Sequence, residues 1–171
     1  AVRRCTSEGF KCEKISIEKI KHFVSKDALN IDGFGKKIVQ NFWEIGLIKL
    51  PHDIFNLDFE RISKLEGWGS LSVDNLKKSI QKSKKVSLDK FIFSLGIRHI
   101  GQENAKLLGE FLKKKENFFR LKNQNFIQEL INIDGIGDTQ INSLKNFFNE
   151  KANLDVILNL SKSLDLSLIH I

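Results

Sequence analysis

The sequences IDGFG at residues 31–35 and INIDGIG at 131–137 decide the fold of this chain. Each places two glycines around one apolar residue, and each precedes an amphipathic helical pattern. GWG at 67–69 and RHIG at 98–101 repeat the arrangement, with His99 in the place of the first glycine. The four turns recur about every 34 residues. Recurrence at such a period indicates one supersecondary unit used several times.

Apolar residues elsewhere recur at helical spacing, as in Val73, Leu76 and Ile80. This pattern is typical of helices with one buried face. Proline occurs once, and the alternation typical of strands is almost absent. The sequence therefore predicts an all-α protein. The expected helices span residues 16–28, 36–45, 51–56, 58–64, 70–84, 87–95, 102–113, 116–121, 124–131, 138–150 and 153–164.

A Gly-x-Gly turn suits two helices that meet at a steep angle, because glycine adopts a positive φ without a Cβ penalty. We expect the apolar residue between the glycines to point into the core. The second helix begins with unpaired N–H groups and the positive end of its dipole, which together suit a phosphate. A contact of this kind reads no base sequence. The alternative is an ordinary helical bundle with C-cap glycines, but four regular repeats in a basic chain favour phosphate binding.

The four turns differ in their suitability for phosphate. Lys36 and Lys37 follow the first turn, the third contains Arg98 and His99, the second has no nearby cation, and the fourth lies between two aspartates. We therefore expect the first and third turns to bind DNA most strongly and the fourth mainly to pack its neighbours. The candidate DNA-binding residues in the turns are Gly33, Phe34, Gly35, Lys36, Lys37, Gly67, Gly69, Ser70, Arg98, His99, Gly101, Gln102, Gly135, Gly137 and Thr139.

The formal net charge of +7 and the pI of about 9.4 favour an anionic partner. The segment 77–90 carries six lysines and one aspartate. We interpret it as an electrostatic strip along duplex DNA, with Lys82, Lys84 and Lys85 as candidate contacts. The alternatives are a solvated helix face and a composition biased by an AT-rich genome. No apolar stretch approaches the ~20 residues needed to cross a bilayer, so we expect no membrane partner.

The only two cysteines, Cys5 and Cys12, are separated by six residues. Structural zinc needs four ligands, normally from two such pairs, and one pair is present. His22 is a possible further ligand, but its place on an apolar helix face favours a buried or capping role. We expect this chain alone to bind zinc weakly or not at all.

Taken in order, the RRC start, HFVSKDALNIDGFG at 22–35, GWG, FIFSLGIRHIGQENAKLL at 91–108 and IDGIG resemble the C-terminal half of bacterial NAD-dependent DNA ligase. The resemblance covers roughly residues 3–160. It implies the second half of a four-cysteine zinc finger at 1–14, with Cys5 and Cys12 as metal ligands. It further implies a domain of four helix-hairpin-helix motifs at 15–160, and a tail at 161–171 toward a BRCT domain. Leu71 stands where a lysine is common in the family.

The resemblance also implies which functions lie elsewhere. In the family, the lysine that takes AMP from NAD belongs to an adenylation domain, and NAD and Mg²⁺ act there. No residue here is assigned a catalytic role, and we expect the chain to be inactive alone. We expect it to bind duplex DNA, preferably nicked, as a monomer in the cytoplasm, at the bacterial nucleoid. The alternatives are a non-catalytic helix-hairpin-helix module of a repair or recombination complex and a helical protein-interaction scaffold.

Overall fold

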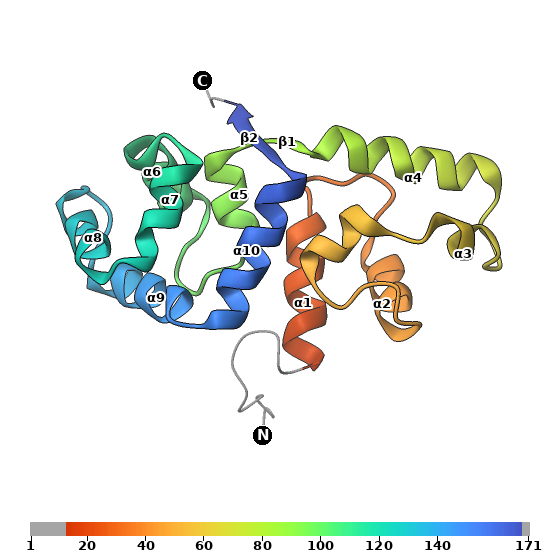
Figure 1. Cartoon of the computed structure of the whole chain (residues 1–171), viewed down its shortest axis with the longest axis horizontal. Coiled ribbons are helices and arrows are strands. Elements are labelled where there is room, and N and C mark those ends of the chain that lie inside the picture. Colours follow the sequence, from red (N-terminus) through yellow and green to blue (C-terminus); the bar gives the residue numbers. More distant parts are fainter. Residues whose placement is uncertain (1–12, 169–171) are drawn as a thin grey trace.

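The structure is a computed structural model that describes residues 13–168 (Figure 1). The α-helices are α1 (Glu13–Val24), α2 (Lys36–Glu44), α3 (Phe59–Ser63), α4 (Ser70–Ser83), α5 (Leu88–Ser94), α6 (Gln102–Leu112), α7 (Lys115–Phe119), α8 (Gln124–Gln128), α9 (Asp138–Phe148) and α10 (Lys151–Ser163). Three 3₁₀ helices, η2 (Pro51–Asn56), η3 (Arg120–Lys122) and η4 (Glu129–Asn132), and two strands, β1 (Lys85–Ser87) and β2 (Asp165–Leu168), complete the described chain. The predicted all-α class is confirmed.

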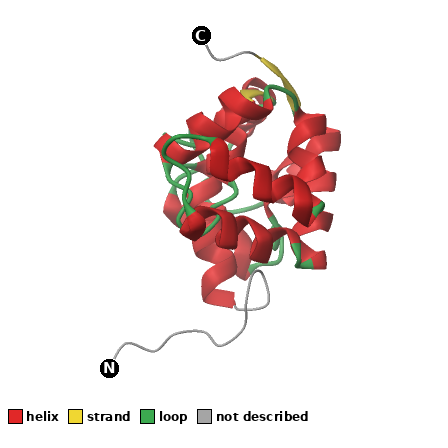
Figure 2. Cartoon of the chain, turned by 90° about the vertical axis from the view of Figure 1, so that its left-hand side faces the viewer, coloured by secondary structure: helices red, strands yellow, loops and turns green. Residues whose placement is uncertain are grey.

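Helices make up most of the described residues, and the strands lie at one edge (Figure 2). Figure 1 places α2, α3 and α4 at one end of the molecule and α6 to α9 at the other, with α1, α5 and α10 between them. The first two glycine turns therefore belong to one end and the last two to the other. The last helix, α10, packs against η2 from the first half of the chain, so both halves share one body.

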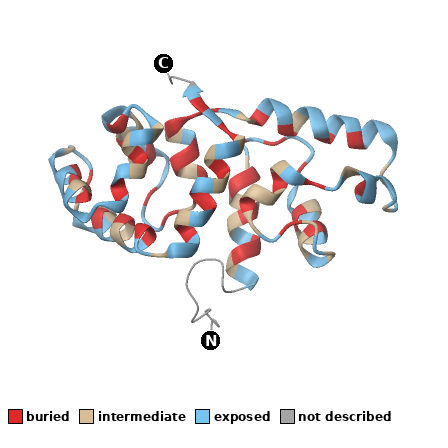
Figure 3. Ribbon diagram, viewed as in Figure 1, coloured by how far each residue is buried: buried red, intermediate tan, exposed pale blue. Residues whose placement is uncertain are grey.

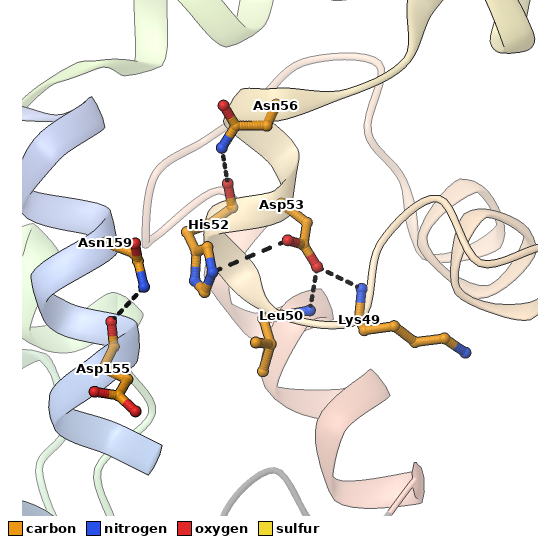
Figure 4. Close-up of polar contacts among 7 residues, drawn as sticks. All are labelled: Lys49, Leu50, His52, Asp53, Asn56, Asp155 and Asn159. Atoms are coloured by element: carbon orange, nitrogen blue, oxygen red, sulfur yellow. Dashed lines mark hydrogen bonds and ion pairs between the residues drawn. The ribbon is translucent and has the colours of Figure 1, made fainter. Parts of the chain in front are cut away.

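The start of η2, which packs against α10, is fixed by a local cap (Figure 4). Pro51 begins η2, where a missing N–H costs nothing and φ is already suitable. Two residues later, the Asp53 carboxylate accepts hydrogen bonds from the N–H groups of Lys49 and Leu50, both at 2.9 Å. These bonds fix the direction in which the chain enters the surface that faces α10.

One continuous core runs through the molecule, and buried residues line the inner face of nearly every helix (Figure 3). At its α5–α9 end, Phe118 of α7 makes edge-on ring contacts with Phe91 of α5 and Phe148 of α9, with centroids 5.8 and 5.3 Å apart. Such pairs stabilise beyond the burial of their area. This aromatic cluster holds the short α7 between two longer helices.

Helix boundaries follow the predicted spans closely, with exceptions. The first helix begins at Glu13 and not at residue 16, and the span predicted at 51–56 is the 3₁₀ helix η2. The first helix ends at Val24 and not at residue 28, because the Ser25 hydroxyl donates to the His22 carbonyl oxygen at 2.6 Å and residues 25–28 form a turn. The spans predicted at 116–121 and 124–131 each divide into a short α-helix and a 3₁₀ helix. The longest described helix, α4, has 14 residues, and no described helix is long and apolar enough to span a membrane.

The two strands were not expected from the sequence. β1 and β2 pair in parallel, with Lys85 opposite Asp165, and the Asp165 N–H donates to the Lys84 carbonyl oxygen at 2.7 Å. Strands this short show no alternation that a sequence pattern could reveal, and their partners lie about 80 residues apart. Residues 165–168, which fall in the segment interpreted as a tail, thus form β2, and Leu166 is buried in the core.

Candidate nucleic-acid interface

The four turns share one backbone geometry. In each, the N–H of the apolar residue between the two key positions donates to a carbonyl oxygen three residues earlier, at 3.0 to 3.2 Å. The residue before it has a positive φ, which is +77° at Gly33, +84° at Gly67, +64° at His99 and +97° at Gly135. His99 therefore occupies the first-glycine place of the third turn, as its spacing predicted. The repeat seen in the sequence is a repeat of conformation.

The apolar residue between these positions fixes each turn to the core. Phe34, Ile100 and Ile136 are 3%, 4% and 4% exposed. Trp68 is half-buried and lies against Phe42, with ring centroids 5.6 Å apart. The prediction that these residues point inward is confirmed, most fully in the first, third and fourth turns. Since the Phe34 side chain is buried, only its backbone is available to a ligand.

The second glycine of each turn is the N-cap of the following helix and has extended backbone. Its carbonyl oxygen accepts the first bond of that helix, as in the pair Val39 N to Gly35 O at 3.0 Å. The N–H groups of the first helical turn have no partner within the helix. Gly35, Gly69 and Gly101 are exposed, and Gly137 is half-exposed. Each turn thus presents peptide N–H groups and a positive helix end toward solvent.

The third and fourth turns use one of these N–H groups internally. The Gly101 N–H donates to the Asn104 side-chain oxygen at 3.3 Å, and the Gly137 N–H donates to the Gln140 side-chain oxygen at 3.0 Å. In the described part of the chain, the N–H groups of Gly35 and Gly69 have no such acceptor. The first two turns therefore offer one more free donor each than the last two.

Side-chain contacts also join the third and fourth turns to each other. The His99 Nδ1 atom lies 3.0 Å from the Ser143 hydroxyl of α9. The Asn104 side-chain N–H donates weakly to the Gly135 carbonyl oxygen at 3.4 Å, and a Cβ on Gly135 would lie 2.8 Å from a Leu107 methyl group. Each of these turns thus packs on the helix that follows the other.

The first and second turns leave a cleft between them, which we call the hairpin cleft. Its volume is about 730 Å³, and its lining includes Asp32, Gly33, Gly67, Trp68 and Lys78. Between the third and fourth turns, Leu107 and Asn104 of α6 lie against Gly135. The two pairs of turns thus share a backbone geometry, and side-chain contacts join the third turn to the fourth.

The four turns also differ in the charged residues that lie beside them. Lys36 and Lys37 are exposed at the start of α2, and no acidic residue lies in that first helical turn. Arg98 is exposed in the third turn, whereas Leu71, next to Ser70 in the second, is 72% exposed. Asp138, which begins α9, is exposed. The first turn is the one that combines a free glycine N–H with adjacent cations.

The remaining candidate residues also lie at the surface. Gln102 and Thr139 are exposed in the first turns of α6 and α9. Lys82 and Lys85 are exposed and Lys84 is half-buried, all near the C-terminal end of α4. A 14-residue helix is about 21 Å long, so these lysines lie about that distance from the second turn.

The sequence of this chain is similar to a known motif and to known proteins. The helix-hairpin-helix motif matches residues 90–157, which contain the third and fourth turns. A DNA ligase of Pelagibacter ubique is 64% identical over 164 residues, which are 96% of this chain and 24% of that protein. DNA ligases of Rickettsia bellii and Wolbachia pipientis are 43% and 42% identical over 95% and 97% of the chain.

The chain is homologous to a segment of DNA ligase. The predicted resemblance to the ligases is confirmed at this level. The chain spans about a quarter of the length of these curated relatives. The motif match covers the last two turns, and the first two turns share with them the hydrogen-bond pattern and the positive φ described above.

The predictions about the metal site concern Cys5, Cys12 and His22. Cys5 and Cys12 lie outside the described residues. Within residues 13–168, no group of three or more His, Cys, Asp or Glu side chains could hold a metal ion. His22 has a structural contact, since its Nε2 atom lies 2.6 Å from the Phe93 carbonyl oxygen.

Sequence reasoning missed Asn104, Gln140 and Asp165. The first two follow their glycines by three residues, which is the spacing of a capping box and could have been recognised. Asp165 gave no local signal, because its neighbours come from the pairing of β2 with β1.

Proposed function

We propose that this chain is the DNA-binding segment of an NAD-dependent DNA ligase. The intact enzyme would join a 3′-hydroxyl to a 5′-phosphate at a nick in duplex DNA, using NAD. This segment would bind the sugar-phosphate backbone without sequence preference and hold the duplex while other domains react. NAD and Mg²⁺ would act in those domains, and we assign no catalytic residue here.

The observation that carries the proposal is the first turn. Three features lie together at Gly35, Lys36 and Lys37: a glycine N–H with no hydrogen-bond acceptor among residues 13–168, the positive end of α2, and two exposed lysines. These groups are the donors and charges that bind a phosphate. The second turn offers the same backbone donors next to the hairpin cleft. Backbone donors and lysines do not distinguish bases, which supports binding without sequence preference.

The remaining proposals concern the intact enzyme. Cys5 and Cys12 would supply two of four thiolates to a structural zinc ion, and the other two would come from elsewhere in the enzyme. Two thiolates are a chemically suitable half of a tetrahedral zinc site. We also propose that the segment is a monomer in the bacterial cytoplasm.

A salt titration of DNA binding tests the proposal. Fluorescence anisotropy with a labelled nicked duplex should give micromolar or tighter affinity at low salt. The logarithm of the binding constant should fall linearly with the logarithm of salt concentration, with a slope of about −0.9 for each phosphate contacted. Two duplexes of unrelated sequence should give the same constants. Absence of salt-sensitive binding at micromolar protein would contradict the proposal and would favour a protein-interaction scaffold.

Replacing Leu71 by lysine is expected to strengthen duplex binding. Leu71 is 72% exposed at the start of α4, so the change removes little buried apolar surface and places a cation beside the second turn. One additional phosphate contact makes the slope of the logarithm of the binding constant against the logarithm of salt concentration steeper by about 0.9. The gain in affinity from Leu71→Lys should therefore grow about eightfold for each tenfold decrease in salt. Anisotropy titrations at several salt concentrations measure both quantities.

The matched control for this change is Leu158→Lys, which adds the same charge at a 51% exposed position on α10. It should change affinity less than twofold, because Leu158 lies in the middle of α10, a helix whose N-cap is Glu150 and not a turn glycine. Equal gains from the two variants would mean that net charge alone, and not a site at the second turn, determines affinity.

A further inference from the structure

A second cleft lies at the opposite end of α4 from the second turn, where β2 joins the helix. Its volume is about 690 Å³, and it is lined by Lys78, Gln81, Lys82, Lys84, Lys85, Ser163 and Asp165. We call it the lysine cleft. Four of its seven lining residues are cations, and one is an anion. The cleft exists because β2 carries the C-terminal segment back to the end of α4.

The lysines of this cleft have no internal counter-ion in direct contact. Within residues 13–168, none of the four ammonium groups lies within 4 Å of a carboxylate oxygen. Four neighbouring cations without ion pairs repel one another, and an external polyanion would relieve this repulsion. Lys78 and Lys82 share one exposed face of α4, and Lys84, Lys85 and Asp165 continue that surface past the end of the helix.

Asp165 is the one carboxylate of the cleft, and its position is fixed. Its Oδ1 atom accepts hydrogen bonds from the Ser167 N–H at 3.0 Å and from the Ser167 hydroxyl at 2.5 Å. These bonds, together with the positive charges of Lys85 and Lys115, lower the pKa of Asp165. Its negative charge therefore persists beside the lysines at neutral pH and opposes the entry of another anion.

The lysine cleft and the hairpin cleft adjoin along α4. Lys78 lines both, so a surface runs from Gly33 and Gly67 at one end of the helix to Asp165 at the other. The length of α4, about 21 Å, corresponds to roughly six base pairs of duplex at 3.4 Å per pair. A strand that follows this surface from the second turn would reach the lysine cleft within that length.

We propose that the lysine cleft is a second phosphate site for the same DNA, about six base pairs beyond the second turn, and that Asp165 is a counter-charge that weakens it. This inference rests on the proposed function, since it needs a duplex already held by the turns. The cleft sets the length of the bound duplex and the affinity for its distal end.

The experiment compares two duplexes with the full chain by anisotropy at several salt concentrations. One has about 4 base pairs, closed by a hairpin loop so that it stays paired, and is too short to span the roughly six base pairs to the cleft; the other has about 24. Lys84→Gln/Lys85→Gln removes two cations from the cleft. For the long duplex, we expect at least a tenfold loss of affinity. The slope of the logarithm of the binding constant against the logarithm of salt concentration should become shallower by about 1.8, which corresponds to two lost phosphate contacts. For the short duplex, we expect less than a twofold change.

Asp165→Asn should have the opposite effect. Removing the counter-charge should strengthen binding to the long duplex about three- to eightfold and leave binding to the short duplex unchanged. Asp165→Ser is a second variant, which is neutral like Asp165→Asn. Circular dichroism melting checks that each variant folds. The matched control is Lys122→Gln/Lys151→Gln, which removes two exposed lysines away from the cleft. It should change neither affinity more than about twofold.

Three results would overturn the inference. They are equal losses in the cleft and control variants, equal effects on both duplex lengths, and no gain from either Asp165 variant. The proposed function fails differently, since the wild-type chain would then show no salt-sensitive binding to any duplex. If the wild-type chain binds both duplexes but the cleft variants change affinity no more than the control does, the second site is refuted and the proposed function stands.

Discussion

Replacing Lys36 and Lys37 by glutamate should weaken duplex binding about a hundredfold at 0.1 M salt, while raising the stability of the fold. Two lost phosphate contacts account for about 60-fold, at about eightfold each, and the new carboxylates add repulsion. Both residues lie in the first turn of α2, where lysine opposes the helix dipole and glutamate favours it. The free energy of unfolding should therefore rise, by about 0.5–2 kcal/mol in total.

Weaker DNA binding together with a higher free energy of unfolding would show that Lys36 and Lys37 bind DNA and do not stabilise the fold. Anisotropy measures the affinity, and urea denaturation measures the free energy of unfolding. Lys122→Glu/Lys151→Glu makes the same change in net charge at exposed positions outside the turns, and should weaken binding far less. If the two double variants lose equal affinity, or if Lys36→Glu/Lys37→Glu unfolds more easily, then the first turn is not the principal phosphate site.

Replacing Phe118 by alanine is expected to lower the free energy of unfolding by about 3–5 kcal/mol, as is usual for a fully buried phenylalanine. Phe118 is 0% exposed and contacts the rings of Phe91, Phe119 and Phe148. Its loss leaves a cavity among three elements that cannot all move to fill it. For a chain of this size, the melting temperature should fall by roughly 10 °C.

Phe111→Ala removes the same ring from a position that is 43% exposed on α6, and should cost less than about 1.5 kcal/mol. Thermal and urea denaturation of both variants make the comparison. A loss below about 1.5 kcal/mol for Phe118→Ala would show that the α5–α7–α9 cluster can repack. The DNA affinity of Phe118→Ala, measured well below its melting temperature, should stay close to that of the wild-type chain.

Most of the helices could be predicted because their signals are local. A helix is specified by apolar spacing over a dozen residues, and a turn by a residue that tolerates positive φ. His99 shows how far such reasoning extends, since its place in the repeat indicated a positive φ before the structure gave +64°. The end of α1 was misplaced because the Ser25 hydroxyl satisfies the helix end earlier than the apolar pattern suggests.

The ranking of the four turns could be predicted only in part. The lysines after the first turn and the aspartates around the fourth were visible in the sequence. The bonds from Gly101 to Asn104 and from Gly137 to Gln140 introduce a second difference, which favours the first two turns as phosphate sites. The third turn, ranked high for Arg98 and His99, therefore has cations but one fewer free N–H.

The sequence by itself determined that this chain has four glycine-centred turns between helices and an excess of positive charge, because both properties reside in contiguous residues. Only the tertiary structure decided which turns pair, that a cleft lies between the first two turns, and that Asp165 lines the lysine cleft. Those features depend on contacts between residues tens of positions apart, such as Lys84 with Asp165, and no local pattern encodes which distant segments meet.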